Sequence, residues 1–236
     1  LDFFNPKIGV FHKLNNNQSI YASFAVGNKE PNRDDYVEST PSSRPLHETL
    51  YDTEVGYKQY GEKLNLIVNL YHMDYKNQLV LTGEINDVGE YTRTNIDASF
   101  RQGVEIEGNY KLNNKITING NMTLSQNKII HFTEYIDNWD TWVQESIVHE
   151  NTDLAFSPNI IWSTLVNYKL TNNLSVDIIS KYVGEQFIDN TSSESRKLND
   201  YLINHLQIAY KWKSKIFKTS RISLKINNLL NNEYIS

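Results

Sequence analysis

The sequence predicts an all-β fold, an antiparallel transmembrane β-barrel, on the strength of three observations. Apolar and polar residues alternate over segments of about ten residues, the connections between segments are alternately short and long, and charged residues fall on the polar phase. Successive side chains of a strand point to opposite faces, so each segment has one apolar and one polar face. Tilted strands of this length cross a bilayer with lipid outside and a wet lumen inside.

The alternation is clearest in residues 116–125. Their even positions carry Ile, Ile, Gly, Met and Leu, and their odd positions carry Thr, Asn, Asn, Thr and Ser. One face is therefore apolar and the other is small and polar. By the same criterion we expect ten strands, at about residues 7–14, 19–27, 50–60, 64–75, 102–112, 116–125, 158–170, 174–184, 200–212 and 221–230.

Short turns are expected after the first, third, fifth, seventh and ninth strands, and most contain asparagine, which tolerates the positive φ of a tight hairpin. Longer loops follow the second, fourth, sixth and eighth strands, at about residues 28–49, 77–101, 131–156 and 185–199. All short turns would then lie at one end of the sheet. Outer-membrane barrels have short periplasmic turns and long extracellular loops, so the sequence predicts this orientation.

Charged and aromatic residues of the expected strands agree with a membrane wall. A charge on the lipid side costs roughly 2–4 kcal/mol near the bilayer midplane, and the strand charges avoid that phase. These charges are Glu54, Lys58, Glu105, Glu107, Asp177, Lys181, Arg221 and Lys225. Aromatic residues near strand ends on the apolar phase fit an interface girdle, namely Tyr57, Tyr110, Trp162, Tyr168, Tyr182, Tyr210 and Trp212.

Composition excludes several classes of protein. The 236 residues include no cysteine, which excludes disulfides, thiolate metal sites and cysteine catalysis. No stretch of 18 apolar residues predicts a transmembrane helix, and no basic patch indicates nucleic-acid binding. The mean hydropathy of −0.54 does not contradict a barrel, because polar lumen residues offset the lipid face.

Several segments resemble TonB-dependent outer-membrane receptors, especially those of Bacteroidetes-type bacteria. They occur in the order of the family: FFNPKIG at 3–9, GNKEPNRDDY at 27–36, LYDTEVGYK at 50–58, YHMDYKNQLV at 71–80, INDVG at 85–89, GVEIE at 103–107 and INNLLNNEY at 226–234. The resemblance implies that the ten strands are an arc of a 22-stranded barrel plugged by an N-terminal domain. We therefore expect residues 1–236 to be a partial barrel domain, without plug, early strands or final strand.

The resemblance also implies a function. It indicates an integral outer-membrane receptor, not an enzyme, that imports a ferric siderophore or another iron complex, with haem or a glycan as alternatives. Import would draw energy from the TonB complex through the absent plug. Further expected partners are outer-membrane lipid and the barrel-assembly machinery, while no cofactor, metal site or catalytic residue is expected.

Candidate ligand-binding residues lie in the expected extracellular loops. The arginines are Arg33, Arg44 and Arg93, and Arg101 likewise lies at a loop or strand-top position. Such arginines could pair with an anionic ligand, or instead anchor loops through ion pairs with Asp34, Asp35 or Glu90. The others are His47, Trp139 and Trp142. His47 is either a ligand group or a solvated loop histidine. The tryptophans could stack on a ligand, or pack on the barrel rim.

Two other classes of protein remain as alternatives. One is a complete ten-stranded outer-membrane enzyme of the omptin protease type, for which Asp34, Asp35 and His47 would have to supply the catalytic groups. The other is a soluble β-sandwich or adhesin-like binding module. Glu105 and Glu107 share a face, which would suit a glycosidase, but such carboxylates also line a barrel wall facing a plug.

Overall fold

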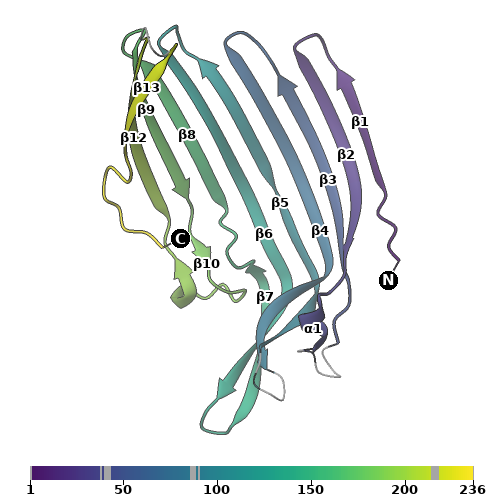
Figure 1. Ribbon diagram of the computed structural model, residues 1–236. Coiled ribbons are helices and arrows are strands. Elements are labelled where there is room, and N and C mark those ends of the chain that lie inside the picture. The colour runs from purple at the N-terminus through teal and green to yellow at the C-terminus, as the bar shows by residue number, and fades with distance from the viewer. Residues whose placement is uncertain are drawn as a thin grey trace.

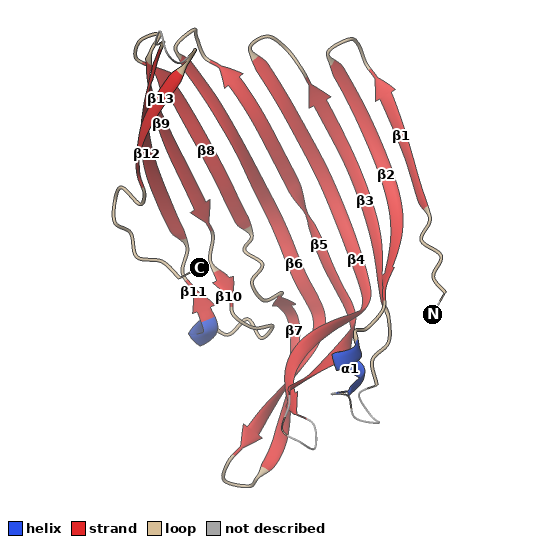
Figure 2. Cartoon of the chain, in the orientation of Figure 1, coloured by secondary structure: helices blue, strands red, loops and turns tan. Residues whose placement is uncertain are grey.

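The wall is a curved sheet of long, tilted, antiparallel strands (Figures 1 and 2). The structure is a computed structural model that describes residues 2–37, 39, 44–85, 89, 91–213 and 218–235. Ten strands follow one another in the order β1-β2-β3-β4-β5-β6-β8-β9-β12-β13. They are β1 (Lys7–Lys13), β2 (Gln18–Lys29), β3 (Glu48–Gln59), β4 (Leu64–Ile85), β5 (Tyr91–Lys111), β6 (Ile116–Asn138), β8 (Ile160–Lys169), β9 (Leu174–Val183), β12 (Tyr201–Trp212) and β13 (Ser220–Ile226).

Smaller elements lie at the end of the wall that carries the long loops. β7 (Val143–Asp153) pairs with the part of β6 beyond the wall, and β10 (Gln186–Phe187) pairs with β11 (Lys197–Leu198). The described residues also form the short helix α1 (Arg33–Val37). None of their helices is long and apolar enough to cross a membrane.

The ten predicted wall strands are confirmed, and most of their ends shift by a few residues, whereas β4, β5 and β6 run ten or more residues further at the long-loop end. The register also confirms the two faces: Ile118 lies opposite Tyr110 and Val166, whereas Asn119 lies opposite Asn109. Asn109 donates a side-chain hydrogen bond to Asn119 on the polar face. We call the face that carries Ile118 the outward face.

The segregation of connections is confirmed as well. In the view of Figure 1 the short turns are uppermost, and the long connections with α1, β7, β10 and β11 are lowermost. Among the described residues β1 and β13 each pair with one neighbour and not with each other, so the ten strands form an open arc. The fold is thus part of a barrel wall and not a closed ten-stranded barrel.

Two of the predicted long loops are wrong. Residues 77–101 mostly continue β4 and β5 beyond the wall, with pairs from Gln78 with Ile96 to Leu81 with Arg93. Residues 131–156 mostly form the hairpin of β6 with β7. Both segments are rich in β-branched and aromatic residues, so the pairing continues beyond the length that a bilayer requires. Residues 86–88 of the expected 85–89 motif lie outside the described part of the chain.

A cluster of buried apolar residues lies beside these hairpins. It consists of Val80, Ile96, Ile129, Phe132 and Leu154. The wall contains the buried residues Val183, Ile203 and Ala209, whereas many of its other apolar residues are exposed on the outward face, such as Leu70, Tyr110 and Leu124. The cluster fixes the two hairpins against each other and against the segment after β7, and this arrangement shapes the site below.

Candidate functional site

A pocket of about 880 Å³ opens at the long-loop end of the wall. It lies between the β4–β5 hairpin, β6, and the segments 154–156 and 188–196. Three arginines line it, Arg93 and Arg101 from β5 and Arg196 from the segment before β11. Aromatic residues of β6 and the loops add apolar surface, namely Phe132, Tyr135, Trp139 and Phe156. Cationic and aromatic groups together suit an anionic or aromatic ligand.

Arg101 has a buried donor without a partner in the described part of the chain. Its guanidinium carbon lies 5.7 Å from the centroid of the Tyr75 ring. Its Nε is buried and has no hydrogen-bond partner among the described residues. A buried donor without a partner costs about 1–3 kcal/mol, so an acceptor brought by a ligand would gain that energy.

Arg93 is held by a loop contact. Its Nη1 lies 3.5 Å from Oδ1 of Asp35, a residue of α1 that is only 7% exposed. The other oxygen of Asp35 accepts a hydrogen bond from the backbone N–H of Asn32 at 2.8 Å. Arg93 therefore both lines the pocket and anchors α1, as the loop-anchoring alternative predicts.

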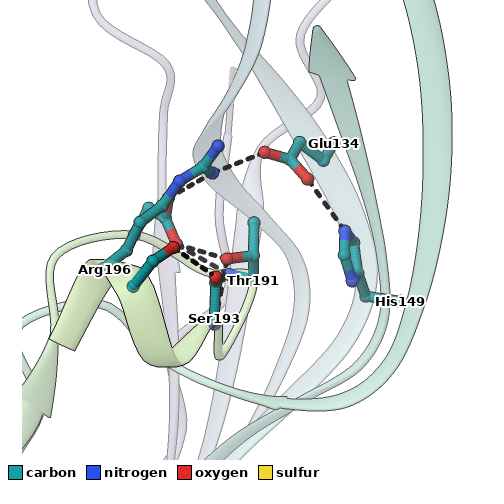
Figure 3. Close-up of polar contacts among 7 residues, drawn as sticks. Glu134, His149, Thr191, Ser193 and Arg196 are labelled. Carbon is teal, nitrogen blue, oxygen red and sulfur yellow. Dashed lines mark hydrogen bonds and ion pairs between the residues drawn. The ribbon is translucent and has the colours of Figure 1, made fainter.

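An ion-pair cluster, here named the latch, joins the β6–β7 hairpin to the 189–196 segment (Figure 3). Nη1 of Arg196 donates to Oε1 of Glu134 at 2.5 Å and to Oδ2 of Asp189 at 2.7 Å. The other oxygen of Glu134 lies 2.9 Å from Nε2 of His149 on β7. Hydrogen bonds to Glu134 and Asp189 raise the pKa of Arg196, so it carries its charge throughout the physiological range.

Asp189 is held in its ionised form. Burial works to raise its pKa, but hydrogen bonds from Thr191 and Arg196 outweigh burial and leave the pKa of Asp189 below its ordinary value. Thr191 donates to Oδ1 of Asp189 through its backbone N–H at 3.0 Å and its hydroxyl at 2.7 Å. Asp189 and Arg196 therefore both stay charged at neutral pH.

The β4–β5 and β6–β7 hairpins also meet directly. Nε2 of Gln144 donates to the carbonyl of Gly83 at 3.1 Å. Gly83 has φ of +85°, and a Cβ there would lie 2.5 Å from the carbonyl oxygen of Tyr135. Only glycine fits this position, because it alone combines a positive φ with so close an approach of two backbones.

The structure brings two of the six expected ligand residues to the pocket, Arg93 and Trp139. Trp142 packs edge-on against Trp139 at 5.8 Å, and the two are 81% and 71% exposed at the hairpin tip. His47 lies against Phe3 with ring centroids 5.2 Å apart. Arg33 and Arg44 are exposed and do not line the pocket.

The omptin-type arrangement does not form among the described residues, because Asp35 pairs with Arg93 and His47 lies against Phe3. Nor do those residues contain a group of three or more His, Asp or Glu that could hold a metal ion.

Sequence analysis did not predict the latch contacts of Glu134, His149, Asp189 and Arg196. Glu134 and Arg196 are 62 residues apart, and their contact depends on how the loops fold over the wall. The only local signal is Asp189 two residues before Thr191, a spacing typical of a side-chain-capped turn. That signal predicts a turn and not an ion pair.

Comparisons with known proteins identify the family to which this sheet belongs. Residues 1–229 match the family described as TonB dependent receptor-like, beta-barrel. No curated protein sequence matches the chain. Three solved structures are similar. The unliganded ferric citrate transporter FecA has a TM-score of 0.76 and 17% identity, over 98% of this chain and 34% of that chain. The siderophore receptor PiuA from Acinetobacter baumannii has a TM-score of 0.73 and 18% identity over 97% of this chain and 32% of that chain, and the copper transporter OprC has a TM-score of 0.73 and 14% identity over 97% of this chain and 34% of that chain. At such identities the likeness shows the fold alone. The chain spans about a third of the length of these structures.

Proposed function

Because the chain belongs to the TonB-dependent receptor-like β-barrel family, we propose that it forms part of the wall of an outer-membrane receptor that actively imports a scarce ligand. Residues 1–236 would be a single partial barrel domain. Its outward face would meet lipid, and its polar face would meet a plug. The family is one of receptors and not of enzymes, which removes the omptin-type alternative.

One observation supports ligand capture at the long-loop end: the pocket lined by Arg93, Arg101 and Arg196 together with aromatic side chains. Arg93 and Arg196 already have carboxylate partners, whereas Arg101 forms no ion pair among the described residues, so the guanidinium of Arg101 is the group best placed to receive an acceptor oxygen. The ligand that fits this set is anionic and carries aromatic or planar groups. Ferric siderophores are the leading candidates, and haem and acidic glycans have related chemistry.

Energy for import would come from an inner-membrane complex that acts through a TonB-type partner on the plug. Ferric citrate and siderophores are named for FecA and PiuA, whereas OprC is named for copper. The shared fold therefore does not select the ligand, and the pocket residues of this chain must do so.

Uptake measurements test the proposal. In a strain that lacks the gene, uptake of radioactive iron from at least one ferric siderophore should fall. It should return when the wild-type gene is restored, and should stop when a proton uncoupler is added. If the deletion leaves the uptake of every siderophore, of haem and of every oligosaccharide unchanged, the proposal that this receptor imports them is wrong. Uptake that survives the uncoupler would overturn energised transport.

A further inference from the structure

The short-turn end of the wall, uppermost in Figure 1, carries a row of cations that we name the cationic rim. Its members are Lys63, Lys111, Lys115, Lys169, Lys211 and Arg221, and all of their side chains are exposed. The ladder register puts them in phase with the polar-face residues of their strands, which are Asn65, Asn109, Asn119, Asn167, Gln207 and Lys225. The rim therefore lies on the polar face, toward the lumen, and not on the outward face.

The rim consists of opposed pairs of like charge. Lys211 lies directly opposite Arg221 in the β12–β13 ladder. The backbone N–H of Lys111 donates to the carbonyl of Lys63 at 2.8 Å, so these two lysines also lie opposite each other. The backbone N–H of Lys169 donates in the same way to the carbonyl of Lys115 at 2.8 Å. Like charges directly opposite each other destabilise a sheet, so the sheet alone gives no reason for these pairs, whereas an anionic partner does.

The chain itself does not neutralise the rim. Within the described part of the chain, none of its members forms an ion pair. Across the turn segments 14–17, 60–63, 112–115, 170–173 and 213–219 the sequence contains a single carboxylate, Glu62. The rim is therefore an uncompensated positive charge at the edge of the wall.

The width of the rim indicates the size of its partner. Its members extend from β4 to β13 in the strand order β4-β5-β6-β8-β9-β12-β13, and six strand spacings amount to about 29 Å along the wall. One phosphate or carboxylate of a small ligand could neutralise a single pair only. An extended polypeptide rises about 3.3 Å per residue, so a segment of about nine residues spans the rim. The rim thus fits an extended polypeptide that carries several carboxylates.

We propose that the cationic rim is a docking surface for an extended acidic segment of a separate periplasmic protein. Carboxylates of that segment lie between the opposed cations and neutralise them, and the flexible lysine stems adapt to their positions. The inference rests on the proposed outer-membrane placement, which puts the short turns in the periplasm, and it is independent of what the receptor imports.

Charge and position favour such a protein over other occupants. Bilayer lipid meets the outward face, and the rim lies on the opposite one. A second copy of the chain would bring the same cations to the contact, and like charges would repel. Higher on the polar face the charges are mixed, and they include Lys58, Lys181, Glu54, Glu105, Glu107 and Asp177. A domain that fills the lumen would meet this mixed zone, whereas a protein that approaches from the periplasm meets the cationic edge first.

Binding of a fluorescent oligoglutamate peptide to the intact receptor in phosphatidylcholine nanodiscs tests the surface. A peptide of about ten glutamates spans the rim, and we expect saturable binding that weakens as salt is added. A peptide of about three glutamates reaches a single pair and should bind at least about tenfold more weakly. Glutamine at Lys63, Lys111, Lys115 and Lys169 should lower the affinity for the longer peptide about tenfold or more, because exposed ion pairs are individually weak and their losses add.

Matched variants separate the rim from general effects of charge. Glutamine at Lys29, Lys76, Lys128 and Lys197 removes equal charge toward the long-loop end and should leave the affinity unchanged. Arginine at the four rim lysines keeps the charge and should retain binding. Heat-modifiable migration in gels verifies that each variant is assembled. Absence of saturable binding to the wild type, or equal affinity of the wild type and the rim glutamine variant, would overturn the docking surface.

Carbodiimide cross-linking in cells identifies the source of the acidic segment, because the reagent joins a lysine directly to a carboxylate. We expect rim lysines, Lys211 among them, to be joined to aspartate or glutamate of a separate periplasmic protein. The rim glutamine variant should also lose the cross-links of Lys211, although Lys211 itself is unchanged. Absence of cross-links, or cross-links only within the receptor's own polypeptide, would overturn the proposal. Uptake in the same strains tests the proposed function separately, so normal uptake without these cross-links overturns this inference alone.

Discussion

The guanidinium of Arg196 donates a 2.5 Å hydrogen bond to the carboxylate of Glu134, across 62 residues of sequence. This contact fastens the β6–β7 hairpin to the 189–196 segment, and both line the pocket at the long-loop end. Arg196 uses the same nitrogen for Asp189, so one side chain holds two carboxylates that come from different connections. The pocket wall therefore depends on one arginine.

Replacing Arg196 by glutamine should loosen this wall and leave the membrane strands unchanged. Charge-assisted hydrogen bonds contribute about 1.5–3 kcal/mol, and partial exposure of Arg196 reduces that to roughly 1 kcal/mol, or about fivefold in local opening. Hydrogen exchange of the intact receptor should quicken in residues 143–153 and 187–196 only. Lys197→Gln, which breaks pairs with the exposed Glu185 and Glu194, is the control and should change little. Equal effects of the two substitutions would contradict the latch.

Acid should open the latch, because protonation of Asp189 removes its charge-assisted contact with Arg196. Its pKa in the folded protein lies below the ordinary value of 3.8, so its contribution is fully present above pH 3.8. That contribution is lost as the pH falls through the lowered folded value. Limited proteolysis of the 187–196 segment should therefore stay constant at neutral pH and accelerate only below pH 3.8. Asp189→Asn should be cleaved faster at neutral pH and lose the acid step, and an unchanged acid step in that variant would refute the role of Asp189.

Gly83→Ala should separate the two hairpins. The new Cβ would lie 2.5 Å from the Tyr135 carbonyl oxygen at a backbone φ of +85°, so the backbone must shift and the Gln144 hydrogen bond to Gly83 is weakened. We expect a cost of about 1 kcal/mol or more, seen as faster exchange in the β4–β5 and β6–β7 hairpins. Gly27→Ala is a matched strand glycine whose added Cβ meets nothing within 4 Å, and it should behave as wild type. A Gly83→Ala protein with wild-type exchange would show that the close approach is not maintained.

The two faces of β6 should respond oppositely to charge. Ile118→Arg places a charge on the outward face at a cost of roughly 2–4 kcal/mol, whereas Asn119→Arg places the same charge on the polar face. Heat-modifiable migration of the receptor in gels measures assembly. Ile118→Arg should reduce the folded fraction much more than Asn119→Arg, and the reverse order would mean that the faces are assigned wrongly.

The wall was predictable from sequence because its two determinants are local. Alternation in residues such as 116–125 decides which face is apolar, and asparagine at Asn113 and Asn114 marks a tight turn within the same stretch. The ends of the hairpins were not predictable, because Gln78 and Ile96 continue a ladder beyond the length that a bilayer requires. The latch was not predictable either, since Glu134 and Arg196 meet only after separate loops fold over one pocket.

The most direct test of ligand capture is calorimetric binding to the intact receptor. Ferric siderophores, haem and acidic oligosaccharides are titrated into wild type, Arg101→Gln and Arg33→Gln. Arg101 lines the pocket with an unpaired Nε, whereas Arg33 is exposed outside it. For the ligand that binds wild type, Arg101→Gln should weaken affinity about tenfold or more, and Arg33→Gln should leave it unchanged. Equal affinity of Arg101→Gln and wild type, or a larger loss in Arg33→Gln, would contradict capture in this pocket.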